Sequence, residues 1–508
     1  MNRIEEQIRR IVSDIWQAFD MKGNKNGGMM MRKCVLALFF VRYVSEFYKQ
    51  YWFGLQEQYG ADDPRLEIYK KLGRFIVPEE CSFDRLYDRR NESDLGEVLN
   101  ESLGKLAKAN SAKMMEEGGF SLFYGVDCNS EELGKKEEKN EFLKNLLLGL
   151  AQLDFDHSSV SLYFQSADWM FEILLGRIIE DEHKENAFTP VPIANLMVAL
   201  TAPAVKERIY DPVCGTGGFL LAAAGRIQGT NFSLFGQENN REVWALAKMN
   251  LLVHELDDAV LSCDDAFESP LLVGKELEKF EVVLAHLPFG QTYWNVEAGR
   301  RDPYGRFGLG VPASNKTDGA FLSHILAVLS EEGRAAVIVQ QGILFRKGVD
   351  ANIRKSMVEQ GILEAVIGLP VNVLYDTNVA GVILVLRKNR KDSGVLFVDI
   401  PGHKEGRKRN ELRQGDLNRL IEIYKEFREQ GRTVPGDDSG MYTKVVDREE
   451  ILASDCNLLF FLYPERKQAA DIDLAEMLKE VRKAEAELIA IRREIEEKKS
   501  LPEYENLI

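Results

Sequence analysis

The first third of the chain shows the hydrophobic periodicity of α-helices. Apolar residues recur three and four positions apart in "IRRIVSDIWQAF" (8–19), "CVLALFFVRYVSEFYKQYW" (34–52) and "LGEVLNESLGKLAKAN" (95–110), as they do along one face of a helix. The cluster of Gly, Asn and Lys residues at 21–28 predicts a loop between the first two of these helices. We therefore expect an all-helical N-terminal domain over residues 1–165.

From about residue 186 the pattern changes to short apolar runs that alternate with amphipathic segments such as "REVWALAKMNLLVHEL" (241–256). The runs are "ERIYDP" (207–212), "SLFGQE" (233–238), "AVLSCD" (259–264), "FEVVLAH" (280–286), "RAAVIVQQ" (334–341), "LEAVIGLP" (363–370) and "GVILVLRK" (381–388). Nearly continuous apolar strands separated by helices predict a doubly wound, Rossmann-like α/β sheet over residues 166–465. In such a sheet, ligands bind at the carboxyl ends of the strands.

The last segment, residues 466–508, is charged and predicted to be helical. One apolar stripe runs along it at three- and four-residue steps, through Leu474, Leu478, Val481, Ala484, Leu488, Ile491 and Ile495. A single stripe on a terminal helix predicts docking to another subunit. Packing back onto the N-terminal helices would give the same stripe, so both alternatives stay open.

Composition limits the class of protein. The chain has 508 residues, of which 45% are hydrophobic and 29% charged, so it can bury more than one core. No apolar run reaches the roughly 18 residues of a membrane span and the first residues lack a signal-peptide pattern, so we expect a cytoplasmic protein that does not enter a membrane. Six scattered cysteines without a CxxC pair predict reduced thiols and no metal site. A formal net charge of −16 argues against a simple basic nucleic-acid binder.

The stretch "YDPVCGTGGFLLAAA" (210–224) predicts a strand end, a glycine-rich turn and the start of a helix. Glycines let a backbone approach a ligand closely, and the helix amides behind them favour ligand oxygen atoms. The stretch does not match a dinucleotide fingerprint, because Leu220 stands where the third glycine would be, and no GK[ST] of a P-loop follows. The candidate ligand-binding residues here are Asp211, Cys214, Gly215, Thr216, Gly217 and Gly218.

Two further polar groups follow the next predicted strands. Glu238, with its neighbour Asn239, ends the second strand, where such folds use a carboxylate to hold ribose hydroxyls. Asp264 and Asp265 end the third strand and suit an adenine amino group. A turn or a helix cap could explain any one of these groups, but three at successive strand ends favour a site for an adenosine-bearing cofactor.

The chain resembles the modification (M) subunits of type I restriction-modification systems, which are adenine-N6 DNA methyltransferases that use S-adenosylmethionine. The resemblance is carried by "AFTP" (187–190), "DPVCGTGG" (211–218), "FGQENNREVWALAKMNLLVH" (235–254), "RFGLGVPASNKTDGAFLSHIL" (306–326) and "GILFRKG" (342–348), and it extends over nearly the whole chain. It implies that the cofactor site is lined by Phe188, Thr189, Pro190, Asp211, Gly215, Gly217, Glu238 and Asp265.

The stretch "EVVLAHLPFG" (281–290) departs from this family at its catalytic motif. The family has Asn-Pro-Pro-Phe where this chain has His286, Leu287, Pro288 and Phe289. In the family, the Asn side chain and the next carbonyl accept hydrogen bonds from the target amino group, while the aromatic ring stacks on the flipped base. A neutral His286 can accept one such bond but an imidazolium cannot. Loss of one well-placed hydrogen-bond partner costs about 2.7–4 kcal/mol of transition-state stabilisation.

Two hypotheses follow from the resemblance. In the first, the chain methylates adenine N6 in DNA within a complex whose separate specificity subunit reads the sequence, and to which a restriction subunit and a second copy of the chain can be added. In the second, the altered motif makes it a catalytically impaired homologue that binds cofactor and clamps DNA as an assembly subunit. Label transfer from the methyl donor to DNA distinguishes the two.

Overall fold

The computed structural model describes residues 28–60, 62–66, 68, 73–116, 118–153, 189–227, 229, 231–289, 293–374, 379–390, 394–402, 412–431 and 441–463. Outside these ranges lie the helix expected at 8–19, most of the loop expected at 21–28, and the terminal helix expected at 466–508. The expected domain boundary at 165 lies outside them as well. Those expectations therefore stay predictions.

The N-terminal part is helical throughout its regular elements, as the periodicity predicts. In chain order these are α2 (Gly28–Tyr59), η1 (Glu79–Cys81), α4 (Phe83–Asp88), α5 (Leu95–Ala109), α6 (Ser111–Met114), η2 (Glu131–Leu133) and α7 (Lys136–Ala151). The apolar positions of α2, α5 and α7 share one buried cluster, so the stripes seen in the sequence face a common core. α2 includes all of the helix expected at 34–52, and α5 matches the one expected at 95–110.

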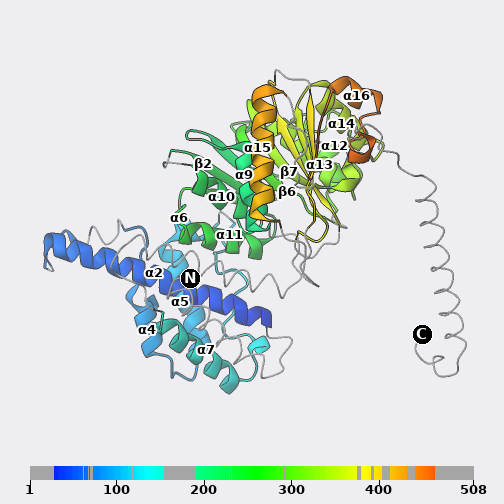
Figure 1. Ribbon diagram of the computed structural model, residues 1–508. Helices are drawn as coiled ribbons and strands as arrows, with labels where there is room; N and C mark the ends of the chain where they lie inside the picture. Colours follow the sequence, from blue (N-terminus) through cyan, green and yellow to red (C-terminus); the bar gives the residue numbers. More distant parts are fainter. Residues whose placement is uncertain are drawn as a thin grey trace, which may run out of the picture. The chain divides into compact units, whose positions relative to one another are not determined.

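The second part is built on a nine-stranded sheet in the order β11-β10-β8-β9-β7-β6-β1-β2-β3. Figure 1 labels β2, β6 and β7 of this sheet. The strands are β1 (Arg208–Asp211), β2 (Ser233–Gln237), β3 (Val260–Ser262), β6 (Phe280–His286), β7 (Leu329–Gln340), β8 (Leu363–Gly368), β9 (Gly381–Arg387), β10 (Val395–Asp399) and β11 (Tyr442–Val446). A separate hairpin pairs β4 (Leu272–Val273) with β5 (Glu276–Leu277). All seven predicted strands are present, and β10 and β11 extend the sheet beyond them.

Strand direction places the functional loops. β6, β1, β2 and β3 pair in parallel, so their carboxyl ends lie at one rim of the sheet. β7 continues this direction beside β6, whereas β9 runs antiparallel between β7 and β8. β1 lies between the strand that follows it in the chain and one that comes much later, which makes it the point at which the strand order reverses.

Helices cover both faces of the sheet. α9 (Val191–Thr201), α10 (Gly218–Arg226), α11 (Arg241–Val253) and α15 (Gln414–Gln430) contribute to one apolar cluster with alternate strand positions such as Ala336 and Ile338. The intervening positions of β7 point to the opposite face, where α13 (Thr317–Val328) packs. The remaining helices are α12 (Val296–Arg300), η3 (Gln341–Leu344), α14 (Val349–Glu359), α16 (Arg448–Ala453) and η4 (Phe460–Leu462).

The helical part is joined to the sheet through α11 and the turn after it. Met249, Leu252 and Val253 belong to the core cluster of the N-terminal helices. The Tyr43 hydroxyl donates to the Val253 carbonyl, 3.2 Å away. Among the residues that the structure describes, no helix is long and apolar enough to cross a bilayer.

Candidate functional site

The glycine-rich turn connects β1 to α10 at the rim. Gly215 and Gly217 have φ angles of 53° and 86°, in the left-handed region that favours glycine. Gly217 caps α10, and its N–H donates to the Cys214 carbonyl over 2.8 Å. A Cβ at Gly218 would meet no atom within 4 Å, so the backbone at the start of α10 faces open space. The turn thus places the start of α10 at the position where the sequence predicts a ligand-binding turn.

Glu238 lies directly beside this turn. Its Oε2 accepts from the Gly215 N–H (3.2 Å) and its Oε1 from the Asn240 N–H (2.8 Å). Burial raises the pKa of Glu238, and these backbone donors oppose the shift. The neighbouring Asn239 is exposed. The carboxylate is therefore fixed against the first loop, which is the position required of an acceptor for two adjacent hydroxyls.

Asp211 ends β1 beneath the turn and is only 1% exposed. Burial raises its pKa well above the usual value, and the nearby charge of Glu238 adds to the shift although the Val213 N–H opposes it. That N–H donates to Asp211 Oδ1 over 3.1 Å, which closes the first turn of the loop. Thr216 is buried too, and its carbonyl accepts from the Asn250 side chain of α11 (2.9 Å).

Asp264 and Asp265 follow β3 on the next strand over, and both make local bonds. Asp265 Oδ1 accepts from the N–H groups of Phe267 and Glu268, at 2.7 and 3.2 Å. Asp264 is exposed and its Oδ2 accepts from the Ser262 hydroxyl. The Glu238 N–H also donates to the Ser262 carbonyl, which ties the second loop to the third. Asp265 thus caps a turn, which is the alternative that the sequence left open for this residue. It also lies at the rim of the sheet, where a ligand contact is expected.

The altered motif ends β6, on the other side of β1. His286 Nδ1 lies 3.0 Å from Thr189 Oγ1, so a hydrogen bond connects the two segments predicted to flank the site. Burial lowers the pKa of His286 to about 4, and the ring is therefore neutral at neutral pH. Phe289 packs edge-on against it, with ring centroids 5.4 Å apart. Phe188, which precedes Thr189, lies outside the described residues, and Pro190 is the N-cap of α9.

Leu287 adds a hydrogen bond that a proline could not make. Its N–H donates to the Ile338 carbonyl of β7 over 3.1 Å, one residue beyond the paired part of the two strands. The side chain is fully buried. Leucine in place of the family's first proline therefore extends the hydrogen-bonded ladder between β6 and β7 and holds the motif against the sheet. Pro288 and Phe289 remain partly exposed.

A chain of hydrogen-bonded, buried polar side chains lies below the loop after β3, and it was not predicted from the sequence. Arg306, which can only donate, lies 3.2 Å from His324 Nδ1. The His324 ring is neutral, because burial and the Arg306 charge lower its pKa to about 3. Its Nε2–H therefore donates to the Tyr210 oxygen (3.2 Å).

The chain continues from Tyr210, whose hydroxyl donates to Gln237 Oε1 over 2.6 Å. At its other end, Arg306 donates to the carbonyls of Ala266 and Phe267, at 2.9 and 2.6 Å, directly after Asp265. These hydrogen bonds thus connect the loop after β3 to the ends of β1 and β2. The sequence signal was present in "RFGLGVPASNKTDGAFLSHIL" (306–326), but nothing in it showed which partners these residues meet.

Comparisons with known proteins show which family the chain belongs to. The family model described as N-6 DNA Methylase matches residues 167–471, and the model described as HsdM N-terminal domain matches residues 11–149. A type I restriction enzyme methylase subunit (MjaVIII) of Methanocaldococcus jannaschii is 30% identical over 456 residues, 84% of this chain and 72% of that protein. The MpnII methylase subunit of Mycoplasma pneumoniae is 27% identical over 496 residues, 89% of each chain.

Among solved structures, the type I restriction-modification methyltransferase subunit of Streptococcus thermophilus superposes with a TM-score of 0.71 at 24% identity, over 90% of this chain and 97% of that one. That likeness shows the shared fold and confirms the predicted fold class. The N-6 DNA Methylase model spans more than half of the chain, and the helical part has its own matching model. The chain therefore belongs to the family of methylase (modification) subunits of type I restriction-modification systems.

Proposed function

We propose that this chain transfers the methyl group of S-adenosylmethionine to N6 of adenine in DNA, as the methylase subunit of a type I restriction-modification complex. S-adenosylmethionine is the cofactor of the family to which the chain belongs. The observation that carries the proposal is the placement of the glycine turn, Glu238 and the motif at 286–289 on adjacent parallel strands. A cofactor held at the loops after β1 and β2 would lie beside the motif that ends β6.

The residues at the rim fit the adenosyl part of this cofactor. Gly215 and Gly217 hold the turn in a left-handed conformation, and the start of α10 at Gly218 borders open space. Glu238 would hold the ribose hydroxyls, with Asn239, Asp211, Cys214 and Thr216 shaping the turn around it. Asp264 and Asp265 would face the adenine, and Phe188, Thr189 and Pro190 would close the site from the segment before α9. The cofactor supplies an electrophilic methyl group on a sulfonium.

His286 would accept one hydrogen bond from the target amine. The Thr189 hydroxyl can either donate to Nδ1 or accept from it. Only a proton on Nδ1, donated to Thr189, leaves Nε2 with a lone pair for the amine. The low pKa of His286 keeps the ring neutral, so no positive charge stands beside the sulfonium.

The other groups of the motif would complete the positioning. The Leu287 carbonyl would accept the second amine N–H, and Phe289 would stack on the extruded base. A bond then forms between N6 and the methyl carbon, the bond from that carbon to sulfur breaks, and N6 releases one proton to solvent. The protein contributes orientation, because no side chain in the motif is placed to act as a strong base.

The proposed partners follow from the family. DNA is the substrate, a specificity subunit reads the sequence, and a restriction subunit and a second copy of the chain complete the assembly. The net charge of −16 supports a division of labour in which another subunit supplies much of the affinity for DNA.

The test is transfer of labelled methyl to cognate DNA by the chain in complex with its specificity subunit. Phe289→Leu should lower the rate roughly 5- to 150-fold, since base stacking is worth about 1–3 kcal/mol, and Phe289→Tyr should keep most of it. An impaired assembly subunit would bind S-adenosylmethionine by calorimetry yet transfer no label. In that case, His286→Asn combined with Leu287→Pro should create transfer where the unsubstituted chain has none.

A further inference from the structure

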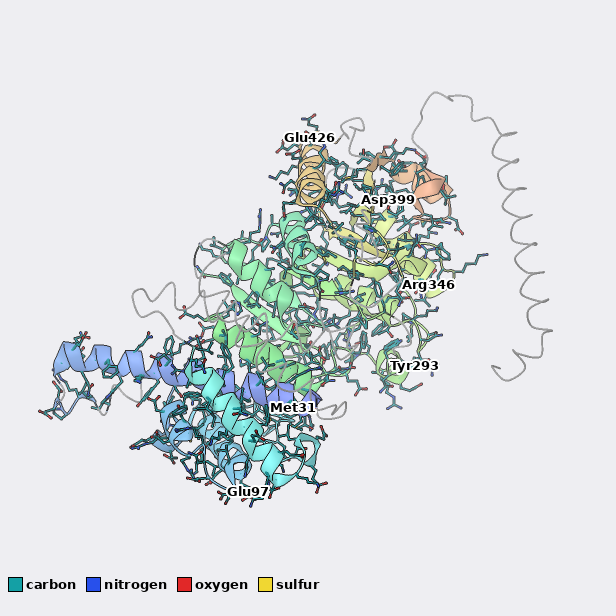
Figure 2. All side chains as sticks on the ribbon, turned by 60° about the horizontal axis from the view of Figure 1, so that its bottom comes forward. Met31, Glu97, Tyr293, Arg346, Asp399 and Glu426 are labelled. Carbon is teal, nitrogen blue, oxygen red and sulfur yellow. The ribbon has the colours of Figure 1, made fainter. Side chains whose placement is uncertain are left out.

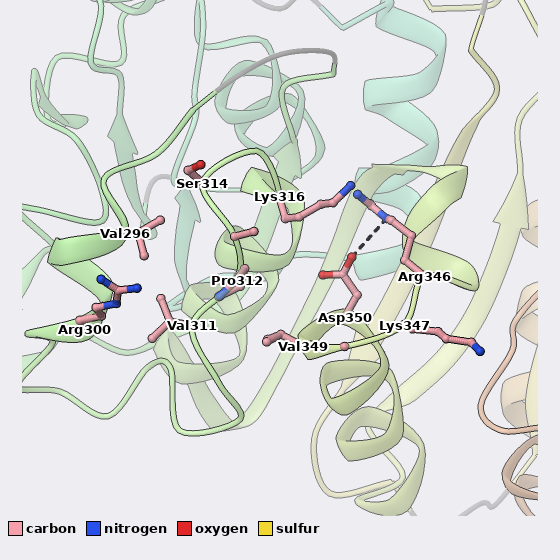
Figure 3. Close-up of a pocket in the computed structure, with 12 residues that line it drawn as sticks. Val296, Arg300, Val311, Pro312, Ser314, Lys316, Arg346, Lys347, Val349 and Asp350 are labelled. Atoms are coloured by element: carbon pink, nitrogen blue, oxygen red, sulfur yellow. Dashed lines mark ion pairs between the residues drawn. The ribbon is translucent and has the colours of Figure 1, made fainter.

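A separate cleft opens at the carboxyl ends of β6 and β7, outside the loops discussed above. Its volume is about 910 Å³, which is in the range of cavities that hold sizeable ligands. Figure 3 shows the side chains around it, which come from α12, the loop before α13, and the loop that leads into α14. The cleft is lined by Val296, Arg300, Val311, Pro312, Ala313, Ser314, Lys316, Arg346, Lys347, Gly348, Val349 and Asp350.

The charge of this lining is opposite to that of the chain as a whole. Four cations face one carboxylate, Asp350, in a protein of net charge −16. Lys316 and Lys347 form no ion pair with any carboxylate in the described part of the chain. Their positive charge therefore stays available to an anion from outside.

Arg346 is held in place by neighbouring acids. It pairs with Asp318 and, through Nε, with Asp350 Oδ2 at 3.1 Å. This contact is an ion pair and not a hydrogen bond, so the buried Nε makes no hydrogen bond among the described residues. In Figure 3 the head groups of Lys316 and Arg346 point toward the same part of the cleft. The two acids compensate the charge of Arg346, so the charge available to an anion at this part of the cleft is that of Lys316.

Two exposed aromatic side chains lie close in sequence to lining residues of the cleft. Tyr293 is 71% exposed and Phe345, beside Arg346, is 48% exposed; Figure 2 shows Tyr293 at the surface. The segment of Tyr293 is anchored by its neighbour Trp294, which donates from its backbone to the Ser314 carbonyl (3.1 Å) and from its ring to that of Ala313 (3.0 Å). Cations interleaved with exposed rings on a rigid frame are typical of surfaces that bind nucleic acid.

We propose that this cleft binds the phosphodiester backbone of the DNA strand that carries the target adenine, with Lys316 and Lys347 as the phosphate contacts and Tyr293 stacking on a neighbouring base. The inference rests on the proposed function. Tyr293 follows Phe289 by four residues, so the two lie at most about 14 Å apart. Each nucleotide of a strand advances about 3.4 Å along the axis of a duplex, so Tyr293 lies within a few nucleotides of the extruded base.

The test is the salt dependence of DNA binding by the complex with its specificity subunit, followed by fluorescence anisotropy. Lys316→Gln and Lys347→Gln should each lower the slope of log affinity against log salt by about 0.9, and weaken binding roughly eightfold at 0.1 M salt. Lys355→Gln, further along α14 and outside the cleft, is the matched control and should change neither. Slopes equal to that of the control would overturn the inference.

Tyr293→Leu gives an independent readout, because a ring carries no charge. It should weaken binding about tenfold without changing the slope. Methyl-donor uptake, measured by calorimetry, should stay unchanged in all these variants.

The failure of the proposed function would look different. If the unsubstituted complex transfers no label, the proposal of methyl transfer is wrong. The same salt titrations on a duplex of arbitrary sequence would still measure DNA binding by the cleft. Normal transfer with unchanged slopes would refute the cleft alone.

Discussion

The replacement of an amide by an imidazole at position 286 makes protonation a question for this chain. A His with an ordinary pKa near 6.5 would lose its acceptor in mildly acidic solution. Because burial lowers the pKa of His286 to about 4, we predict that the ratio of label transfer by the unsubstituted chain to that by His286→Asn stays constant from pH 8 down to about pH 5. A ratio that falls tenfold per unit below pH 6.5 would contradict this.

The same shift affects stability. A lowered His pKa means that the unfolded state binds the proton more tightly, so stability is full above the ordinary value of 6.5 and is lost as the pH falls from there toward about 4. His324 acts in the same direction, with a pKa of about 3. Denaturant unfolding should therefore show a smaller loss of stability between pH 7 and pH 5 in His286→Asn than in the unsubstituted chain, and an equal loss would refute the lowered pKa of this partly buried ring.

Thr189 offers a sharper test of how His286 is oriented. Removing its hydroxyl by Thr189→Val should lower the rate constant for transfer roughly 2- to 12-fold, the value of one hydrogen bond of about 0.5–1.5 kcal/mol. Thr189→Ser keeps the hydroxyl and should restore the rate. Because Thr189 also belongs to the segment expected to close the cofactor site, the KM for S-adenosylmethionine must be measured alongside. A change confined to that KM would show that Thr189 contacts the cofactor and does not orient His286.

At the scale of elements, the sequence predicts β1, β2, β3 and β6 well because their apolar runs end in polar signatures. It does not reveal that β9 runs antiparallel between β7 and β8, since periodicity carries no information on strand direction. β10 and β11 were not predicted, although the run "VLFV" (395–398) of β10 is as apolar as those of the predicted strands; both follow polar, charged stretches. The polar chain at the third loop was missed because its partners, such as Tyr210 and His324, are 114 residues apart. Local patterns cannot report contacts at that separation.

That polar chain yields a prediction about one loop. Arg306→Lys keeps the charge but removes the fork that holds the Ala266 and Phe267 carbonyls. We expect weaker uptake of S-adenosylmethionine in calorimetry, together with a loss of about 1–3 kcal/mol in the free energy of unfolding.

The control for that prediction is another buried arginine fork in the sheet. Arg387 pairs with Glu364 at 3.0 Å and contacts the Tyr424 hydroxyl, at the end of β9 opposite the rim loops. Arg387→Lys should cost comparable stability without weakening cofactor uptake. Equal losses of uptake in both variants would mean that Arg306 acts only through general stability.

At the scale of the whole molecule, one carboxylate joins the helical part to the sheet. Asp257, in the turn after α11, accepts from Arg74 Nε at 2.9 Å and pairs with Lys113 Nζ at 2.5 Å. Arg74 Nη1 also donates to the Tyr43 hydroxyl of α2, over 2.9 Å. Burial alone would raise the pKa of Asp257, but the bonds and charges of Arg74 and Lys113 lower it. Its contribution is therefore present above the ordinary pKa and lost as the pH falls through the lowered value.

Asp257→Asn should therefore weaken the coupling between the two parts. Two cations would be left without their partner in a partly buried site, which we expect to cost about 2–4 kcal/mol. Glu242→Gln is the matched control, because it removes a more exposed ion pair across the same junction, to Lys33 at 2.8 Å; such pairs contribute about 1 kcal/mol or less. If the Asp257 cluster makes the helices and the sheet unfold together, calorimetry should show one transition for the unsubstituted chain and for Glu242→Gln, and two for Asp257→Asn. A single transition in all three, with equal losses of stability, would show that the apolar contacts of α11 couple the two parts without this carboxylate.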